Sequence, residues 1–134
     1  MNWDAIGAVG EIVGAMSAIR EIILATASND ALRVGQMKDW GLEGYYESRA
    51  SELGIDIVEA SRNDWANAVY FWMYWGQWVS SHEQRDLTEL EHILIKIFSI
   101  SGVRHTWDVS PLGKAFLDEE FVQFVDDILV RNSV

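Results

Sequence analysis

The stretch from Asn63 to Ser81 limits the folds open to this chain more than any other. It holds seven aromatic residues: Trp65, Tyr70, Phe71, Trp72, Tyr74, Trp75 and Trp78. On a helical wheel these rings cover well over half of the circumference. A helix that is apolar on all sides is either buried on all sides or spans a membrane. Because Asn67 and Gln77 interrupt this surface, we predict the central helix of a bundle or an oligomer interface.

Helical periodicity recurs along the rest of the chain, whereas strand signals are scarce. Gly41 and Gly44 predict a kink or break near 41–44, because a glycine in a helix interior costs ~1 kcal/mol. We therefore expect an all-α fold, a single-domain bundle of four to five helices over residues 1–134. Besides 63–81, the expected helices cover 3–27, 28–53, 86–102 and the chain from Asp118 onward.

Local start and stop signals place several helix ends. Gly54 is a stop signal after the second helix, and Gly102 is one after the helix that starts near residue 86. Thr88 with Glu91 matches a capping box, which marks a helix start. The segment 55–62 fits either a short helical turn or a loop, and the sequence leaves this choice open.

The charge balance argues against several classes of partner. Ten Lys and Arg stand against 21 Asp and Glu, for a net charge of −11. That balance opposes binding to nucleic acid and to an anionic membrane surface. The absence of Cys excludes disulfides and thiolate metal sites, and fits a reducing compartment. We expect a cytoplasmic protein with no nucleic-acid partner, and keep peripheral membrane association as the alternative.

The N-terminal segment 6–27 is mostly apolar, which raises the question of a membrane span. A span needs ~20 apolar residues with few charges, yet Glu11, Arg20 and Glu21 interrupt this one. A secretory signal would start with basic residues, whereas this chain starts with Asp4 and no Lys or Arg. The sequence therefore disfavours both a membrane span and a signal peptide.

Small residues form a second stripe along the same segment. Gly7, Gly10, Gly14, Ala18 and Ala25 share one side of the expected helix, where a second backbone can approach closely. The partner is either another helix of the same chain or a second copy. We predict a homo-oligomer, with a two-fold dimer as the favoured form.

Two stretches resemble a group of short bacterial proteins of uncharacterised function. Residues 1–15, MNWDAIGAVGEIVGA, match an opening of the form MNW(D/E)AIGAxGEIxGA. Gly102-Val103-Arg104, Trp107 and the stretch 116–129 resemble the close of the same proteins. The resemblance implies a helical fold and a bacterial source, but no reaction. In that group an N-terminal membrane anchor is usual, and here residues 17–21 interrupt it.

Few groups of residues have the spacing of a catalytic site or a metal site. Glu89-x-x-His92 has the spacing of a di-iron ligand pair, but such sites need two of these motifs and only one is present. His105 and Asp108 are spaced so that an acid–base pair is an alternative to two independent side chains. The acidic residues 118–120 are best interpreted as helix-start charges. We therefore expect no metal and no cofactor.

Three functions remain in order of preference. The first is a non-enzymatic bundle that acts through protein–protein contact or self-association. The second is a protein that binds a small apolar molecule against the aromatic helix 65–78. The third is a metal-dependent enzyme. For the second function the candidate ligand contacts are Asn67, Phe71, Trp72, Tyr74, Trp75 and Trp78, and for the first the candidate interface is Gly7, Gly10 and Gly14.

Overall fold

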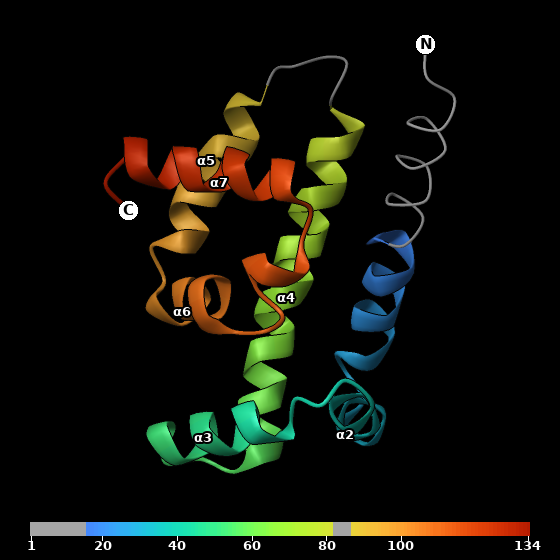
Figure 1. The fold of residues 1–134 in the computed structure, drawn as a ribbon. Helices are drawn as coiled ribbons and strands as arrows, with labels where there is room; N and C mark the ends of the chain where they lie inside the picture. Colours follow the sequence, from blue (N-terminus) through green and yellow to red (C-terminus); the bar gives the residue numbers. More distant parts are fainter. Residues whose placement is uncertain (1–15, 82–86) are drawn as a thin grey trace.

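The computed structural model describes residues 16–81 and 87–134, and within these ranges every regular element is a helix (Figure 1). The all-α prediction is confirmed for this part of the chain, but four to five helices were too few. A helix over 16–26 comes first. It is followed by α2 (Asp30–Asp39), α3 (Glu43–Leu53), α4 (Ile57–Ser80), α5 (Thr88–Phe98), α6 (Ser101–Val109), the short 3-10 helix η1 (Lys114–Phe116) and α7 (Glu119–Arg131).

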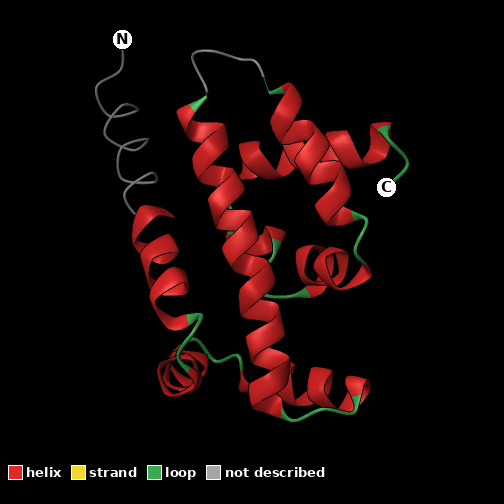
Figure 2. Cartoon of the chain, turned by 180° about the vertical axis from the view of Figure 1, so that it is seen from behind, coloured by secondary structure: helices red, strands yellow, loops and turns green. Residues whose placement is uncertain are grey.

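The central element is α4, which has 24 residues and a length of about 36 Å. The 16–26 helix runs along one side of it, α5, α6 and α7 lie on another side, and α2 and α3 lie at its N-terminal end (Figures 1 and 2). Asp56 caps α4 by accepting a 2.8 Å hydrogen bond from the Glu59 amide. The open segment 55–62 therefore contains the cap and first turns of α4. None of the described helices is long and apolar enough to cross a bilayer.

The predicted break near 41–44 is confirmed, and it divides the expected 28–53 helix into α2 and α3. Gly41 adopts a φ of 68°, a left-handed conformation that ends α2. Asn29 caps α2 by accepting a hydrogen bond from the Leu32 amide, and Gly54 (φ 69°) ends α3 as expected. These three signals are local, so the sequence alone located them.

The expected 86–102 helix starts close to the predicted residue, at Thr88, but its predicted cap and its predicted end are wrong. Leu87 occupies the N-cap position of α5 without a side-chain cap hydrogen bond, so Thr88 and Glu91 do not form the predicted capping box. The helix ends at Phe98, an extended residue at Ile100 separates it from α6, and Gly102 lies inside α6. Tertiary packing explains this result, because α6 buries an apolar face of its own and is not a continuation of α5.

Aromatic rings join four helices into the core. Phe71 of α4 stacks on Phe98 of α5, with ring centroids 5.5 Å apart. Trp107 of α6 meets both rings edge-on at 5.1 Å, and Phe121 of α7 meets Trp107 at 6.3 Å. Such pairs are worth about 0.5–1.5 kcal/mol each beyond the area they bury. They fix α5, α6 and α7 against the C-terminal half of α4.

The aromatic helix is central, as predicted, but one of its sides is exposed. Ala66, Tyr70, Met73 and Gln77, spaced along one side of α4, form an exposed stripe, and Tyr70 and Met73 are each 42% exposed. We call these four residues the outer stripe of α4. The other described helices pack on the remaining sides, so the wheel identified apolar positions correctly but not how many of them would be covered.

Two buried polar contacts attach the first helices to α4. Arg33 is fully buried, donates to Ser61 Oγ at 3.0 Å and to Ala27 O at 2.9 Å, and forms an ion pair with Asp30. Trp65 donates its indole N–H to Thr26 Oγ1 in the 16–26 helix at 2.9 Å. Arg33 thus has one acceptor on α4, one just after the 16–26 helix and one on its own helix, and the Trp65 indole has one on the 16–26 helix. Because each of these donors has its own acceptor, the arrangement is specific.

Two further sequence expectations concern the 3–27 helix. Arg20 reaches the face of α4 at Gly76, where a Cβ atom would lie 3.3 Å from Arg20 Nη2. Gly76 thus leaves room for the guanidinium of Arg20, the residue that interrupts the apolar segment 6–27. The predicted interface glycines Gly7, Gly10 and Gly14 lie outside the described residues.

Gly113 provides a test of the packing between α6 and the following turn. A Cβ at this position would lie 2.0 Å from Thr106 O and 2.5 Å from Trp107 O, both backbone atoms that cannot move aside. We expect Gly113→Ala to lower the free energy of unfolding in urea by about 3 kcal/mol. Gly102→Ala is the control, because no atom lies within 4 Å of its Cβ position, and it should raise stability by about 0.5–1 kcal/mol. Equal stability of both variants would contradict this packing.

Candidate functional site

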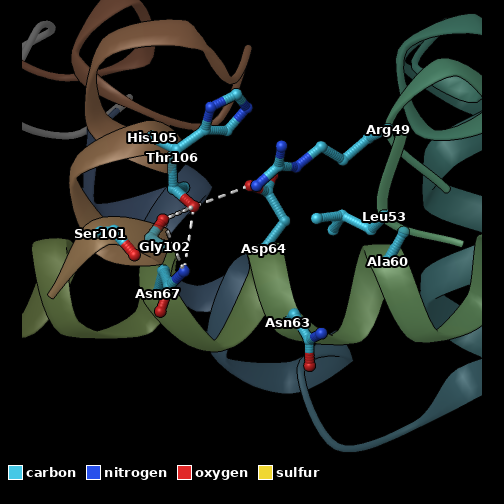
Figure 3. Close-up of a pocket in the computed structure, with 10 residues that line it drawn as sticks. All are labelled: Arg49, Leu53, Ala60, Asn63, Asp64, Asn67, Ser101, Gly102, His105 and Thr106. Carbon is cyan, nitrogen blue, oxygen red and sulfur yellow. Dashed lines mark hydrogen bonds between the residues drawn. The ribbon is translucent and has the colours of Figure 1, made fainter. Parts of the chain in front are cut away.

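A cavity of about 440 Å³ lies where α3, the first half of α4 and α6 meet (Figure 3). Most of the residues that line it are polar. Leu53 and Ala60 supply the only apolar side chains among them. The lining residues are Arg49 and Leu53 of α3, Ala60, Asn63, Asp64 and Asn67 of α4, and Ser101, Gly102, His105 and Thr106 of α6.

Helical spacing brings these side chains to one place. In α4, residues 60, 63, 64 and 67 follow the spacing of a single helix face. In α6, residues 101, 102, 105 and 106 do the same, and Arg49 and Leu53 are one turn apart in α3. Three helices thus each present one polar face to the same space.

Asp64 forms the floor of the cavity and is 6% exposed. Its Oδ1 accepts a hydrogen bond from Thr106 Oγ1 at 2.9 Å, and its Oδ2 accepts from Tyr46 OH at 2.6 Å and Ser110 Oγ at 2.5 Å. A buried carboxylate is costly unless it is hydrogen-bonded, and charge-assisted bonds of this kind are short and strong. Asp64 therefore joins α3, α6 and the residue after α6 to α4.

The Tyr46 phenol is held as a donor in this network. Burial raises its pKa well above the usual range, and the nearby charge of Asp64 and the hydrogen bond to it act in the same direction. The hydroxyl therefore stays protonated and continues to donate to the carboxylate at any ordinary pH.

Asn67 extends the network across the floor. Its Nδ2 donates to Thr106 Oγ1 at 3.0 Å and to Gly102 O at 3.3 Å, while Thr106 donates onward to Asp64 (Figure 3). Asn67 was a predicted ligand contact, and it does line the cavity. It also donates to the backbone of a neighbouring helix, at Gly102 O of α6.

Two cavity groups keep polar atoms without a partner inside the protein. His105 Nε2 is buried and neither accepts nor donates a hydrogen bond. The Arg49 side chain is 17% exposed, and among the described residues its guanidinium pairs only with Glu52 Oε1, through Nη1 at 3.1 Å. The unpaired capacity of this site is therefore concentrated on a cation and an imidazole.

The proposed His105–Asp108 pair does not form. Asp108 accepts from Arg104 Nε at 2.8 Å and pairs with Lys114 Nζ at 3.3 Å. Burial acts to raise the pKa of Asp108, but the hydrogen bonds from Arg104 and Lys114 outweigh burial and lower this pKa below its usual value. Arg104 and Lys114 take the place of His105 as partners of the carboxylate, and spacing along the helix cannot reveal this.

The predicted aromatic ligand contacts lie away from this cavity. Phe71, Trp72, Tyr74 and Trp75 are at most 5% exposed and belong to the core. Trp78 packs against Phe121 at 5.7 Å between ring centroids. Of the six residues predicted to contact an apolar ligand, Asn67 alone lines the polar cavity.

The Glu89-x-x-His92 motif gains no further ligands from the residues that the structure describes. Glu89 and His92 are both exposed on α5. Within residues 16–81 and 87–134, no three His, Asp or Glu side chains gather as a metal site would require.

The sequence alone did not identify four of the lining residues: Arg49, Asn63, Asp64 and Ser101. One signal was present, because Asn63, Asp64 and Asn67 put three polar residues on one face at the start of an aromatic helix. A buried polar face predicts hydrogen-bond partners on another helix. The sequence does not identify that helix.

Comparisons with known proteins add no name to this site. The chain matches no protein-family model, and no match is found among curated proteins or solved structures. The resemblance to short bacterial proteins therefore stays an expectation.

The Asp64 network predicts a marked loss of stability when its acceptor is removed. Asp64→Ala would leave the hydroxyls of Tyr46 and Ser110 without their acceptor, while Thr106 Oγ1 could still donate to Gly102 O at 3.1 Å. We expect a loss of about 3 kcal/mol in the free energy of unfolding. Tyr46→Phe should cost about 1.5–3 kcal/mol, and in a double-mutant cycle with Asp64→Ala the two losses should not add. Urea unfolding measures all three variants.

Glu47→Ala is the matched control, because Glu47 is an exposed acid on α3. It should change the free energy of unfolding by no more than about 0.5 kcal/mol. A loss from Asp64→Ala no larger than that of the control would refute the role of Asp64 as the centre of the network.

Proposed function

We propose that this protein is a non-catalytic module that binds a small polar molecule in the cavity between α3, α4 and α6. One observation carries the proposal. A cavity of about 440 Å³ combines a hydrogen-bonded floor with unpaired polar atoms on Arg49 and His105. Sites for small molecules usually fall between about 300 and 1,000 Å³ and orient the ligand with a few such groups.

The chemistry of the floor favours binding over catalysis. A nucleophilic hydroxyl needs an adjacent base that takes its proton. Here Thr106 and Ser110 already donate their protons to Asp64, and that carboxylate already accepts three hydrogen bonds. The floor is thus occupied with holding the helices together, which leaves Arg49, His105 and Asn63 to meet a ligand.

The walls of the cavity are also rigid. Tyr46, Asn67 and Thr106 tie α3, α4 and α6 together beneath it. A site on packed helices loses little conformational entropy when it binds a ligand, so modest contacts suffice for affinity.

Filling the cavity should abolish binding. Gly102 lines it, and no atom lies within 4 Å of a Cβ placed there, so Gly102→Leu should occupy the space without a backbone clash. We expect the wild-type protein to show millimolar or tighter binding of some members of a small polar fragment library, observed by protein NMR as shifts of cavity residues. Gly102→Leu should lose those shifts.

Gly35→Leu is the matched control, since Gly35 lies in α2 and also has no atom within 4 Å of its Cβ position. Both substitutions replace a helical glycine and should stabilise their helices similarly, by up to about 1 kcal/mol. Retained binding in Gly102→Leu, or no shift of any cavity residue in the wild-type protein, would overturn the proposed function.

Self-association is a second candidate, and the outer stripe of α4 favours it. Tyr70 and Met73 are each 42% exposed on adjacent turns, beside the exposed Ala66. Clustered apolar side chains on a surface mark contact sites, and a two-fold dimer is the commonest way to cover one. Ala18 and Ala25, which continue the predicted small-residue stripe, are also exposed.

The two candidate seams are separable by mutation. If α4 forms the interface, Tyr70→Lys with Met73→Glu should shift the protein from a dimer toward a monomer of 15.2 kDa in size exclusion with light scattering. Gly10→Leu should instead weaken a dimer built on the N-terminal glycines. Trp75 is 5% exposed, so its substitution would disturb the core and could not test an interface. A wild-type monomer at tens of micromolar would refute self-association.

A further inference from the structure

The free hydrogen-bonding capacity of the cavity is mostly that of donors. Arg49 carries five N–H donors and no acceptor, and among the described residues one nitrogen, Nη1, is engaged, with Glu52 Oε1 at 3.1 Å. The Glu52 side chain is 63% exposed, and ion pairs this exposed contribute little. Figure 3 shows Arg49 extending from α3 toward α6, where the His105 ring lies.

Asp64, the acceptor at the floor of the cavity, does not pair with these donors. Asp64 accepts hydrogen bonds from three hydroxyls, and no ion pair joins it to Arg49 within 4.0 Å. The free N–H groups of Arg49 are not buried, so water meets them until a ligand brings its own acceptors. A ligand would therefore supply the hydrogen-bond acceptor that the cavity does not offer to Arg49.

We propose, on the basis of the proposed function, that the ligand is a small organic monocarboxylate whose carboxylate binds the Arg49 guanidinium. The planar fork of guanidinium N–H groups matches a carboxylate in a bidentate arrangement. His105 and Asn63 also line the cavity, and Leu53 and Ala60 would receive a short apolar body.

The charge of the floor selects among anions. Asp64 is a carboxylate in the same cavity as Arg49, so every negative charge on a ligand meets repulsion from it as well as attraction to the guanidinium. A monoanion needs one cation to offset it, whereas a phosphate dianion would need a second, which the lining residues lack apart from His105. This balance favours a monocarboxylate over inorganic phosphate.

The experiment compares charged and neutral probes of the same shape on the full chain. Acetate, propionate and benzoate are titrated against acetamide, propionamide and benzamide, with inorganic phosphate as a separate arm. Side-chain NMR signals of His105, Asn63 and Asn67 report binding. We expect carboxylates to bind at least about tenfold more tightly than their amides, as loss of a charge-assisted bond implies.

Variants of Arg49 locate the origin of that preference. R49Q should remove it, and R49K should weaken it, because lysine keeps the charge but not the planar fork. R131Q is the matched control, since Arg131 is an exposed arginine paired with Glu91 at 2.9 Å, and it should keep the wild-type preference. Circular dichroism checks the fold, and R49K decides the result if R49Q does not fold.

The outcomes separate this inference from the proposed function. Equal binding of carboxylates and amides, unchanged in R49K and R49Q, would overturn the monocarboxylate and leave a polar-ligand site in place. Tighter binding of phosphate than of any carboxylate would overturn the choice of anion. If no probe shifts a cavity signal, and the fragment screen on wild type and Gly102→Leu is also negative, both proposals fail together.

Discussion

Three hydroxyl groups donate to the buried carboxylate of Asp64, and the arrangement of α3, α4 and α6 depends on these bonds. The donors Tyr46, Thr106 and Ser110 lie 18, 42 and 46 residues away along the chain. A buried carboxylate without them would destabilise the fold by several kcal/mol, so the three partners cannot separate independently. The cavity above Asp64 exists because this network holds three polar helix faces together but does not fill the space between them.

The two halves of α4 have different physical roles. Its C-terminal half carries Phe71 into a core where rings of α5 and α6 pack against it. Its N-terminal half presents Asn63, Asp64 and Asn67 to the cavity. Aromatic packing supplies stability through buried area that needs no polar partner, so the first half of the same helix can hold polar groups. One long helix thus supports both the core and the candidate site.

The unpaired polar atoms of the cavity favour a polar ligand over an apolar one. An apolar molecule would need displaced or absent rings beside Trp72 and Trp75, yet these side chains are at most 5% exposed and pack on each other at 5.6 Å. A polar molecule needs acceptors for groups that the fold leaves free, and Arg49 and His105 are such groups. Binding of this kind is specific because a ligand that lacks the right acceptor leaves those groups unsatisfied.

The sequence by itself determined the helical class, the break at Gly41, the end of α3 at Gly54 and the start of α7 at Asp118. These features follow from local backbone preferences and caps, which need no knowledge of distant residues. Tertiary structure alone decided that Ile100 would separate two helices, that the outer stripe of α4 would be exposed, and that Arg49 and Asp64 would share a cavity. A helical wheel shows which side chains share a face, but the neighbour that meets the face is chosen by packing between segments far apart in sequence.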